Sequence, residues 1–263
     1  MMNIKDSKRI VIKVGSSTIT HPNGGLNLQK IDKLAMVLSD IKHSGKEVIL
    51  VSSGAVSAGV AKLNMKNRPS LMKEKQAAAS VGQCELMFIY DKFFSQYGQL
   101  ISQLLITKTV TSNKVLRKNV INTLETLLAY GVIPIINEND SVAVDEIAYG
   151  DNDTLSAMSA YLVKADLLIL LSDIDGLYDD NPSTNPSAKL IPLVSKVDES
   201  IEAMAQGAGS IHGTGGMITK INAAAFANEH GISMVIANGK EPSILYDILA
   251  DHYRGTLFKG EEI

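Results

Sequence analysis

Residues 9–17 read RIVIKVGSS, a short β-branched run that carries one lysine and ends in glycine and two serines. The apolar residues and the turn after them predict a strand from Arg9 to Val14. Lys13 interrupts this strand, and a lysine is seldom buried without a partner. Either its side chain ends the strand in water, or it projects into a polar site at the carboxyl edge of a sheet, where ligands of open α/β folds bind. The glycine directly after the strand favours the second alternative.

Segments with helical periodicity alternate with short apolar runs along the whole sequence. The predicted strands are 9–14, 47–51, 100–106, 132–136, 166–171, 232–237 and 256–258. The predicted helices lie at about 31–41, 71–96, 116–127 and 154–163, with further helices after 52–55 and after 213–220. Residues 179–190 contain two prolines among polar residues and predict an exposed loop or hairpin. The alternation favours βαβ units around a mainly parallel sheet.

The composition narrows the class of protein. The 263 residues are 45% hydrophobic, which is enough for one large α/β domain or two small ones. The 25 basic and 28 acidic residues are scattered, so we do not expect nucleic acid as a main partner. The apolar runs are too short to cross a membrane and the N-terminus is unlike a signal peptide, so we expect a cytoplasmic protein. Cys84 is alone, and the histidines show no metal-binding spacing, so we expect neither a disulfide nor a protein metal site.

Residues 213–220, GTGGMITK, give the sharpest local signal for a ligand. Three glycines and two hydroxyls precede a helix, so successive backbone N–H groups can surround phosphate oxygens, and Lys220 can reach a terminal phosphate. The segment lacks the glycine that precedes the lysine of a Walker motif, and Ile218 takes the last glycine position of the dinucleotide pattern. On this segment alone, a phosphate site and a glycine-rich turn with a solvated lysine are equally good interpretations.

Two polar clusters bracket the alternating residues 142–148. They are Asn137-Glu138-Asn139-Asp140 and Gly150-Asp151-Asn152-Asp153. Their placement predicts a hairpin whose two ends face one pocket. The alternative is an ordinary polar loop in which Asp153 or Thr154 caps the following helix.

Together, these motifs resemble those of the amino-acid kinase family. The resemblance is carried by IKVGSS at 12–17, VSSGA at 51–55, INEND at 136–140, GDND at 150–153, LSD at 171–173, GLY at 176–178, and GTGGM at 213–217 with Thr219 and Lys220. It covers nearly the whole chain, from about residue 8 to Phe258. It implies a three-layer αβα sandwich around a central, mainly parallel sheet. The expected organisation is a single domain, 1–263, in which a lobe of about 1–165 binds glutamate and a lobe of about 166–263 binds ATP.

The resemblance also implies a reaction, the ATP-dependent phosphorylation of the γ-carboxylate of L-glutamate, which is the first step of proline biosynthesis. By position, Lys13 and Lys220 stabilise the transferred phosphoryl group, and Asp153 orients both lysines. The glutamate-binding positions are Ser53, Asp140 and Asn152, and we expect Asp140 to face the α-ammonium group of the substrate. The nucleotide-binding positions are Lys13, Ser172, Asp173, Thr214, Gly215, Gly216, Met217, Ile218, Thr219 and Lys220.

The expected cofactors are ATP and Mg²⁺. The resemblance further suggests proline as a feedback inhibitor, glutamate-5-semialdehyde dehydrogenase as a partner, and a homo-oligomer. The sequence stops at Ile263, so we expect a short form without the C-terminal PUA domain that many relatives carry. Two alternatives stay open: another amino-acid kinase, for acetylglutamate or aspartate, and a noncatalytic sensor of glutamate or proline. The presence of both Lys13 and Lys220 favours an enzyme, because a sensor has little use for paired cations at a point of transfer.

Overall fold

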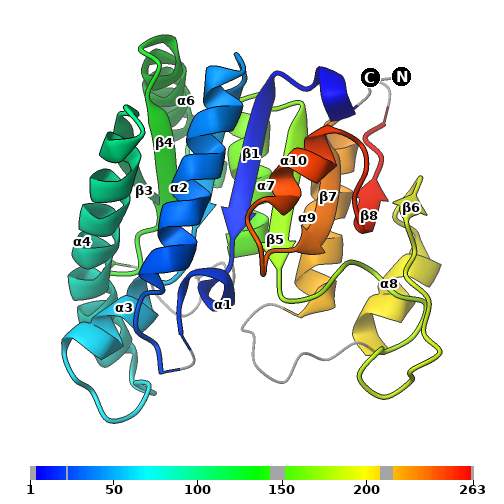
Figure 1. Cartoon of the computed structure of the whole chain (residues 1–263), viewed down its shortest axis with the longest axis horizontal. Helices are drawn as coiled ribbons and strands as arrows, with labels where there is room; N and C mark the ends of the chain where they lie inside the picture. The colour runs from blue at the N-terminus through cyan, green and yellow to red at the C-terminus, as the bar shows by residue number, and fades with distance from the viewer. Residues whose placement is uncertain (1–3, 22, 143–151, 208–215, 262–263) are drawn as a thin grey trace.

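One eight-stranded sheet runs through the protein (Figure 1). The computed structural model describes residues 4–21, 23–142, 152–207 and 216–261. Within them the sheet order is β3-β4-β2-β1-β5-β7-β8-β6. The strands are β1 (Arg9–Val14), β2 (Glu47–Ser52), β3 (Ile101–Ile106), β4 (Ile133–Glu138), β5 (Leu167–Ser172), β6 (Leu193–Val194), β7 (Ser233–Asn238) and β8 (Gly255–Phe258). Every predicted strand is confirmed to within two residues, and β6 is the addition.

The strands are mainly parallel, as predicted. β1 lies between β2 and β5, where Ile12 is level with Leu50 on one side and with Ile169 on the other. β8 runs antiparallel to β7, and β6 is parallel to β8, so this edge of the sheet is reversed. The sheet therefore joins strands from the first and second halves of the chain.

Helices cover both faces of the sheet and give three layers (Figure 1). One face carries α2 (Leu28–His43), α4 (Met72–Gln96) and α10 (Ile244–Leu249), and the other carries α6 (Lys114–Ala129), α7 (Asn152–Leu162) and α9 (Met217–Glu229). The shorter helices are η1 (Ile4–Asp6), α1 (Ser16–Ile19), α3 (Ala55–Lys62), α5 (Thr109–Ser112) and α8 (Glu199–Gly207). Strand residues alternate between two apolar cores, with Val11 in one and Ile10 and Ile12 in the other. This is the expected αβα sandwich.

Local sequence signals set several helix ends. Asn27 caps α2 by accepting the backbone N–H of Lys30. The helix predicted at about 116–127 is confirmed as α6, in which Leu124 is buried and Leu116 is exposed. α7 begins at Asn152, two residues before its predicted start, so Asp153 lies inside its first turn and does not cap it.

The helices α3 and α4 pack with their backbones in direct contact. A Cβ atom on Gly59 would overlap the carbonyl group of Ala78, and one on Gly82 would overlap the carbonyl group of Ala55. Only glycine fits at these two positions. Because α3 starts directly after Ser53 and Gly54, this contact fixes the end of β2 relative to α4.

The carboxyl ends of the parallel strands form one edge of the sheet, where the connections diverge. The strand that follows β1 in sequence, β2, lies on one side of β1 in the sheet. The strands that follow β5 lie on the opposite side, beginning with its neighbour β7. Such a switch point is where open α/β sheets bind ligands. The loop predicted at 179–190 is a hairpin, closed where Tyr178 pairs with Leu190. Among the helices that the structure describes, none has the length and apolar character needed to span a membrane.

Candidate active site

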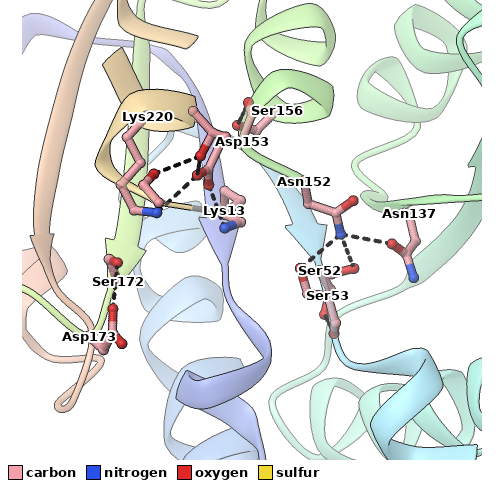
Figure 2. Close-up of polar contacts among 12 residues, drawn as sticks. Lys13, Ser52, Ser53, Asn137, Asn152, Asp153, Ser156, Ser172, Asp173 and Lys220 are labelled. Atoms are coloured by element: carbon pink, nitrogen blue, oxygen red, sulfur yellow. Dashed lines mark hydrogen bonds and ion pairs between the residues drawn. The ribbon is translucent and has the colours of Figure 1, made fainter. Parts of the chain in front are cut away.

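Two lysines from distant parts of the chain meet on one carboxylate at this edge (Figure 2). Lys13 extends from β1, Asp153 from the first turn of α7, and Lys220 from the first turn of α9. The Nζ atom of Lys13 lies 2.5 Å from Oδ1 of Asp153, and the Nζ atom of Lys220 lies 3.0 Å from Oδ2. Thr219 donates its hydroxyl to the same Oδ2 atom at 3.1 Å. Each ammonium group therefore binds its own oxygen of Asp153.

This cluster is buried, and its described charged members are two lysines and one carboxylate. Asp153 has no exposed surface, and Lys13 and Lys220 are only 7% and 6% exposed. Burial by itself raises the pKa of Asp153, but the two ammonium groups together outweigh burial, so the pKa lies below its ordinary value. Among the described side chains of the cluster, two lysines share one carboxylate. The arrangement therefore favours an anion beside it, and Lys13 projects into a polar site and not into water.

A second polar cluster lies at the ends of β2 and β4 (Figure 2). The Nδ2 atom of Asn152 donates to Ser53 Oγ at 2.9 Å, to Asn137 Oδ1 at 2.9 Å and to the carbonyl oxygen of Ser52 at 3.2 Å. Asn152 and Asp153 are consecutive in the first turn of α7. One helix start therefore connects the cationic cluster to a group of amides and hydroxyls that can bind polar ligand atoms.

Asp140 lies just beyond the end of β4 and is partly buried. Burial raises its pKa. Among the ion pairs between described residues, none involves Asp140. A carboxylate in this state favours a cationic ligand group, because a nearby positive charge stabilises its ionised form.

Apart from Lys13 on β1, the predicted nucleotide residues that the structure describes lie at the end of β5 and at the start of α9. Ser172 ends β5 and donates its hydroxyl to Asp173, which is exposed. Gly216 is the N-cap of α9, and a Cβ atom there would meet no atom of the described residues within 4 Å. Met217 is buried in the apolar core and Ile218 packs against it while partly exposed, and the backbone N–H groups of this first helical turn are available to a ligand.

Glycine is needed at two positions of the site for different physical reasons. Gly54 has a φ of +106°, and a Cβ atom there would lie 3.0 Å from Cδ1 of Ile19, so the turn before α3 requires glycine. At Gly15 a Cβ atom would lie 3.9 Å from Nζ of Lys13 without overlap. Glycine at residue 15 therefore keeps the space beside the Lys13 ammonium group open.

The carboxylates of the site fit a Mg²⁺ ion that binds together with the nucleotide. In the part of the chain that the structure describes, no group of three or more His, Cys, Asp or Glu side chains could hold a metal. Asp153 already binds two lysines, whereas Asp173 is an exposed carboxylate at the same sheet edge. Mg²⁺ bound to ATP needs only one or two protein carboxylates, since phosphates and water supply its other ligands.

Some predicted positions lie outside the described residues. These are Thr214, Gly215, Gly150, Asp151 and residues 143–148 of the predicted hairpin. The structure adds two residues of α4 that sequence reasoning missed. Gln83 accepts a hydrogen bond from Nδ2 of Asn137 at 2.9 Å, and the hydroxyl of Tyr90 lies 2.8 Å from Ser52 Oγ. Their seven-residue spacing, which puts both on one helix face, is the only local signal.

The sequence matches the model of the amino acid kinase family over residues 8–238. The chain belongs to the amino acid kinase family. It is 54% identical to the glutamate 5-kinase of Listeria innocua, over 99% of this chain and 96% of the relative. It is 56% identical to the glutamate 5-kinase of Clostridium acetobutylicum, over 97% of this chain and 96% of the relative.

Solved structures share the fold at much lower identity. Carbamate kinase from Giardia lamblia bound to AMP-PNP has a TM-score of 0.69 at 14% identity, covering 98% of this chain and 100% of that chain. Isopentenyl phosphate kinase from T. acidophilum has a TM-score of 0.64 at 18% identity, covering 95% and 99%. This likeness establishes the fold alone, which is the three-layer arrangement that the sequence predicts.

Proposed function

We propose that the protein transfers the γ-phosphoryl group of ATP to the γ-carboxylate of L-glutamate, which yields L-glutamyl 5-phosphate and ADP. The observation that carries the proposal is the pair of lysines on Asp153, because it gathers positive charge at a point where two anions must meet. The glutamate 5-kinase names of relatives that match almost the whole chain support glutamate as the acceptor. This reaction is the first step of proline biosynthesis.

The chemistry requires charge stabilisation more than proton transfer. A carboxylate oxygen of glutamate forms the new bond to the γ-phosphorus, while the bond from phosphorus to the bridging oxygen of ADP breaks. The acceptor is already ionised, so no general base is needed. Lys13 and Lys220 face the negative charge of the moving group, and each is worth up to ~4 kcal/mol at ~4 Å and an effective dielectric of ~20. Asp153, whose pKa is lowered, stays ionised and holds both ammonium groups in place.

The substrates divide between the two lobes. The N-terminal lobe, about 1–165, binds glutamate through Ser53, Asp140 and Asn152. Asp140 pairs with the α-ammonium group, so free glutamate is preferred over N-acetylglutamate, which lacks this group. The C-terminal lobe, about 166–263, binds the nucleotide through Ser172, Asp173 and the segment 214–220, with Lys13 from β1. Mg²⁺ on the nucleotide offsets part of the phosphate charge.

The decisive experiment traps the product. Incubation with ATP, Mg²⁺, L-glutamate and hydroxylamine is expected to yield a hydroxamate, because hydroxylamine attacks the acyl phosphate. Parallel reactions with N-acetylglutamate and L-aspartate are expected to give much less. Hydroxamate from one of these acids only would identify another amino-acid kinase. Glutamate binding without any ADP release would identify a sensor.

A further inference from the structure

We propose that Gln83, in the middle of α4, is a positioning residue that sets which hydrogen-bonding groups the acceptor site presents to glutamate. The proposal rests on the proposed function. Gln83 acts through Asn137 and Asn152, and these amides together with Ser53 form a continuous relay from α4 to the substrate-binding end of β2.

Two backbone groups fix the direction of the bonds in this relay. The backbone N–H of Glu138 donates to Oδ1 of Asn137 at 2.9 Å, so this side-chain atom has to be the oxygen. The carbonyl oxygen of Ser52 accepts from Nδ2 of Asn152 at 3.2 Å, so this atom has to be the nitrogen. A backbone N–H can only donate and a backbone C=O can only accept. The orientation of both amides therefore follows from the backbone.

The nitrogen of Asn137 then needs an acceptor on its other side. Oε1 of Gln83 provides it at 2.9 Å, and both side chains are buried. If Gln83 offered no acceptor, a buried N–H group would lose its partner, and the Asn137 side chain would be held only through its Oδ1 atom. A side chain held at one end only can shift, and a shift of Asn137 weakens the bond that its Oδ1 atom accepts from Asn152.

At its ligand end, the relay determines which hydrogen-bond donors and acceptors face the substrate. Ser53 Oγ accepts from Nδ2 of Asn152, so the Ser53 hydroxyl keeps its own hydrogen for another acceptor. This hydrogen suits a carboxylate oxygen of glutamate. Oδ1 of Asn152 points away from Asn137 and Ser53 (Figure 2) and can only accept, so it suits the α-ammonium group. Gln83 thus holds one donor and one acceptor in place for a zwitterion.

A second contact from α4 supports the same scaffold. Ser52 Oγ donates to the carbonyl oxygen of Ser53 at 3.0 Å, so the hydroxyl of Tyr90, 2.8 Å away, is the donor to Ser52. Burial raises the pKa of Tyr90, which keeps this phenol protonated. One face of α4 therefore holds the end of β4 through Gln83 and the end of β2 through Tyr90.

A double-mutant cycle between Gln83 and Ser53 tests the proposal. Gln83→Met keeps the side-chain volume but removes the acceptor, and we expect the KM for L-glutamate to rise about tenfold while the KM for ATP changes less than about twofold. In a Ser53→Ala background, the same change is expected to raise the glutamate KM clearly less than it does in the wild type, because the relay has lost its donor and keeps only the Asn152 acceptor at its ligand end.

Gln99→Met is the matched control. Gln99 is also buried, and its amide lies 2.9 Å from Nε2 of His43, before the amino end of β3. This variant is expected to lose a similar amount of thermal stability and to leave both KM values unchanged. Gln83→Asn, which shortens the side chain, is the second variant if Gln83→Met does not fold, and the same non-additivity is expected.

The outcomes separate the two proposals. Additive effects of the Gln83 and Ser53 changes, or equal rises in the KM for glutamate and for ATP, would overturn the role of Gln83. Wild-type protein that forms no hydroxamate from L-glutamate would instead overturn the proposed function, and the role of Gln83 with it.

Discussion

Replacing Lys220 with methionine removes one of the two buried ammonium groups while keeping a side chain of similar length. The Nζ atom of Lys220 lies 3.0 Å from Oδ2 of Asp153, and Lys13 remains on Oδ1 after the change. Among the described residues, the cluster therefore goes from two lysines on one carboxylate to one lysine on one carboxylate. It keeps a neutral pair, so we expect the variant to fold.

The magnitude follows from the charge that is lost. An ammonium group at ~4 Å from the moving phosphoryl group contributes up to ~4 kcal/mol at an effective dielectric of ~20. At ~1.4 kcal/mol per factor of ten, the kcat of Lys220→Met is expected to fall about a thousandfold. The KM for glutamate is expected to change little, because Ser53, Asp140 and Asn152 do not contact Lys220.

The assay is initial-rate ADP release at saturating ATP and glutamate, with hydroxamate formation as a second readout. Lys118→Met is the control, because this exposed lysine on α6 is expected to have no effect on kcat. Circular dichroism at the assay temperature checks that the variant is folded. A folded Lys220→Met protein whose kcat falls less than about tenfold would refute the charge argument.

Three further predictions follow from burial and packing. Asp140→Asn is expected to raise the glutamate KM by about tenfold or more. Burial raises the pKa of Asp140, so ionisation of this carboxylate destabilises the folded state as pH rises through the folded pKa. Asp140→Asn should therefore also raise the Tm at pH 7, but not at a pH below the ordinary pKa of 3.8. A lower Tm at pH 7 would contradict this. The pKa of Asp153 is lowered, so the stability that its ionised form contributes is present above pH 3.8 and is lost as pH falls through the folded pKa. Urea unfolding at several pH values should show this loss in the wild type and not in Asp153→Asn. Gly59→Ala is expected to destabilise the protein by about 1–3 kcal/mol, because its Cβ atom meets the backbone of Ala78, and an unchanged Tm would rule out this contact.

Most of the fold could be predicted from local patterns. The strand at Arg9–Val14 and the buried stripe of α2 follow directly from the spacing of apolar residues. The reversed direction of β8 and β6 could not be predicted in the same way, because strand direction depends on how the connection crosses the sheet. The strand β6, Leu193–Val194, is also too short to carry a pattern of apolar residues. In α6, Leu124 is buried and Leu116 is exposed, because tertiary packing decides which apolar residues of a helix are covered.

The site was only partly predictable. No local pattern connects Lys13 to Lys220, and it was the family resemblance that paired them; the structure brings both to Asp153. Gln83 could not be found from the sequence, because a glutamine in a helix usually faces solvent. Gln83 is instead buried and bonded to Asn137 at the end of β4, so the relay is a property of the folded chain.

The central position of β1 has a consequence for biosynthesis. Ribosomes release β1 and its neighbour β2 early, but β5, which covers the other edge of β1, begins only at Leu167. Until then the nascent chain holds an apolar strand with one unpaired edge, and such an edge attracts other chains. Substitutions that delay the docking of β5 should therefore reduce the yield of soluble protein while leaving the specific activity of each correctly folded molecule intact.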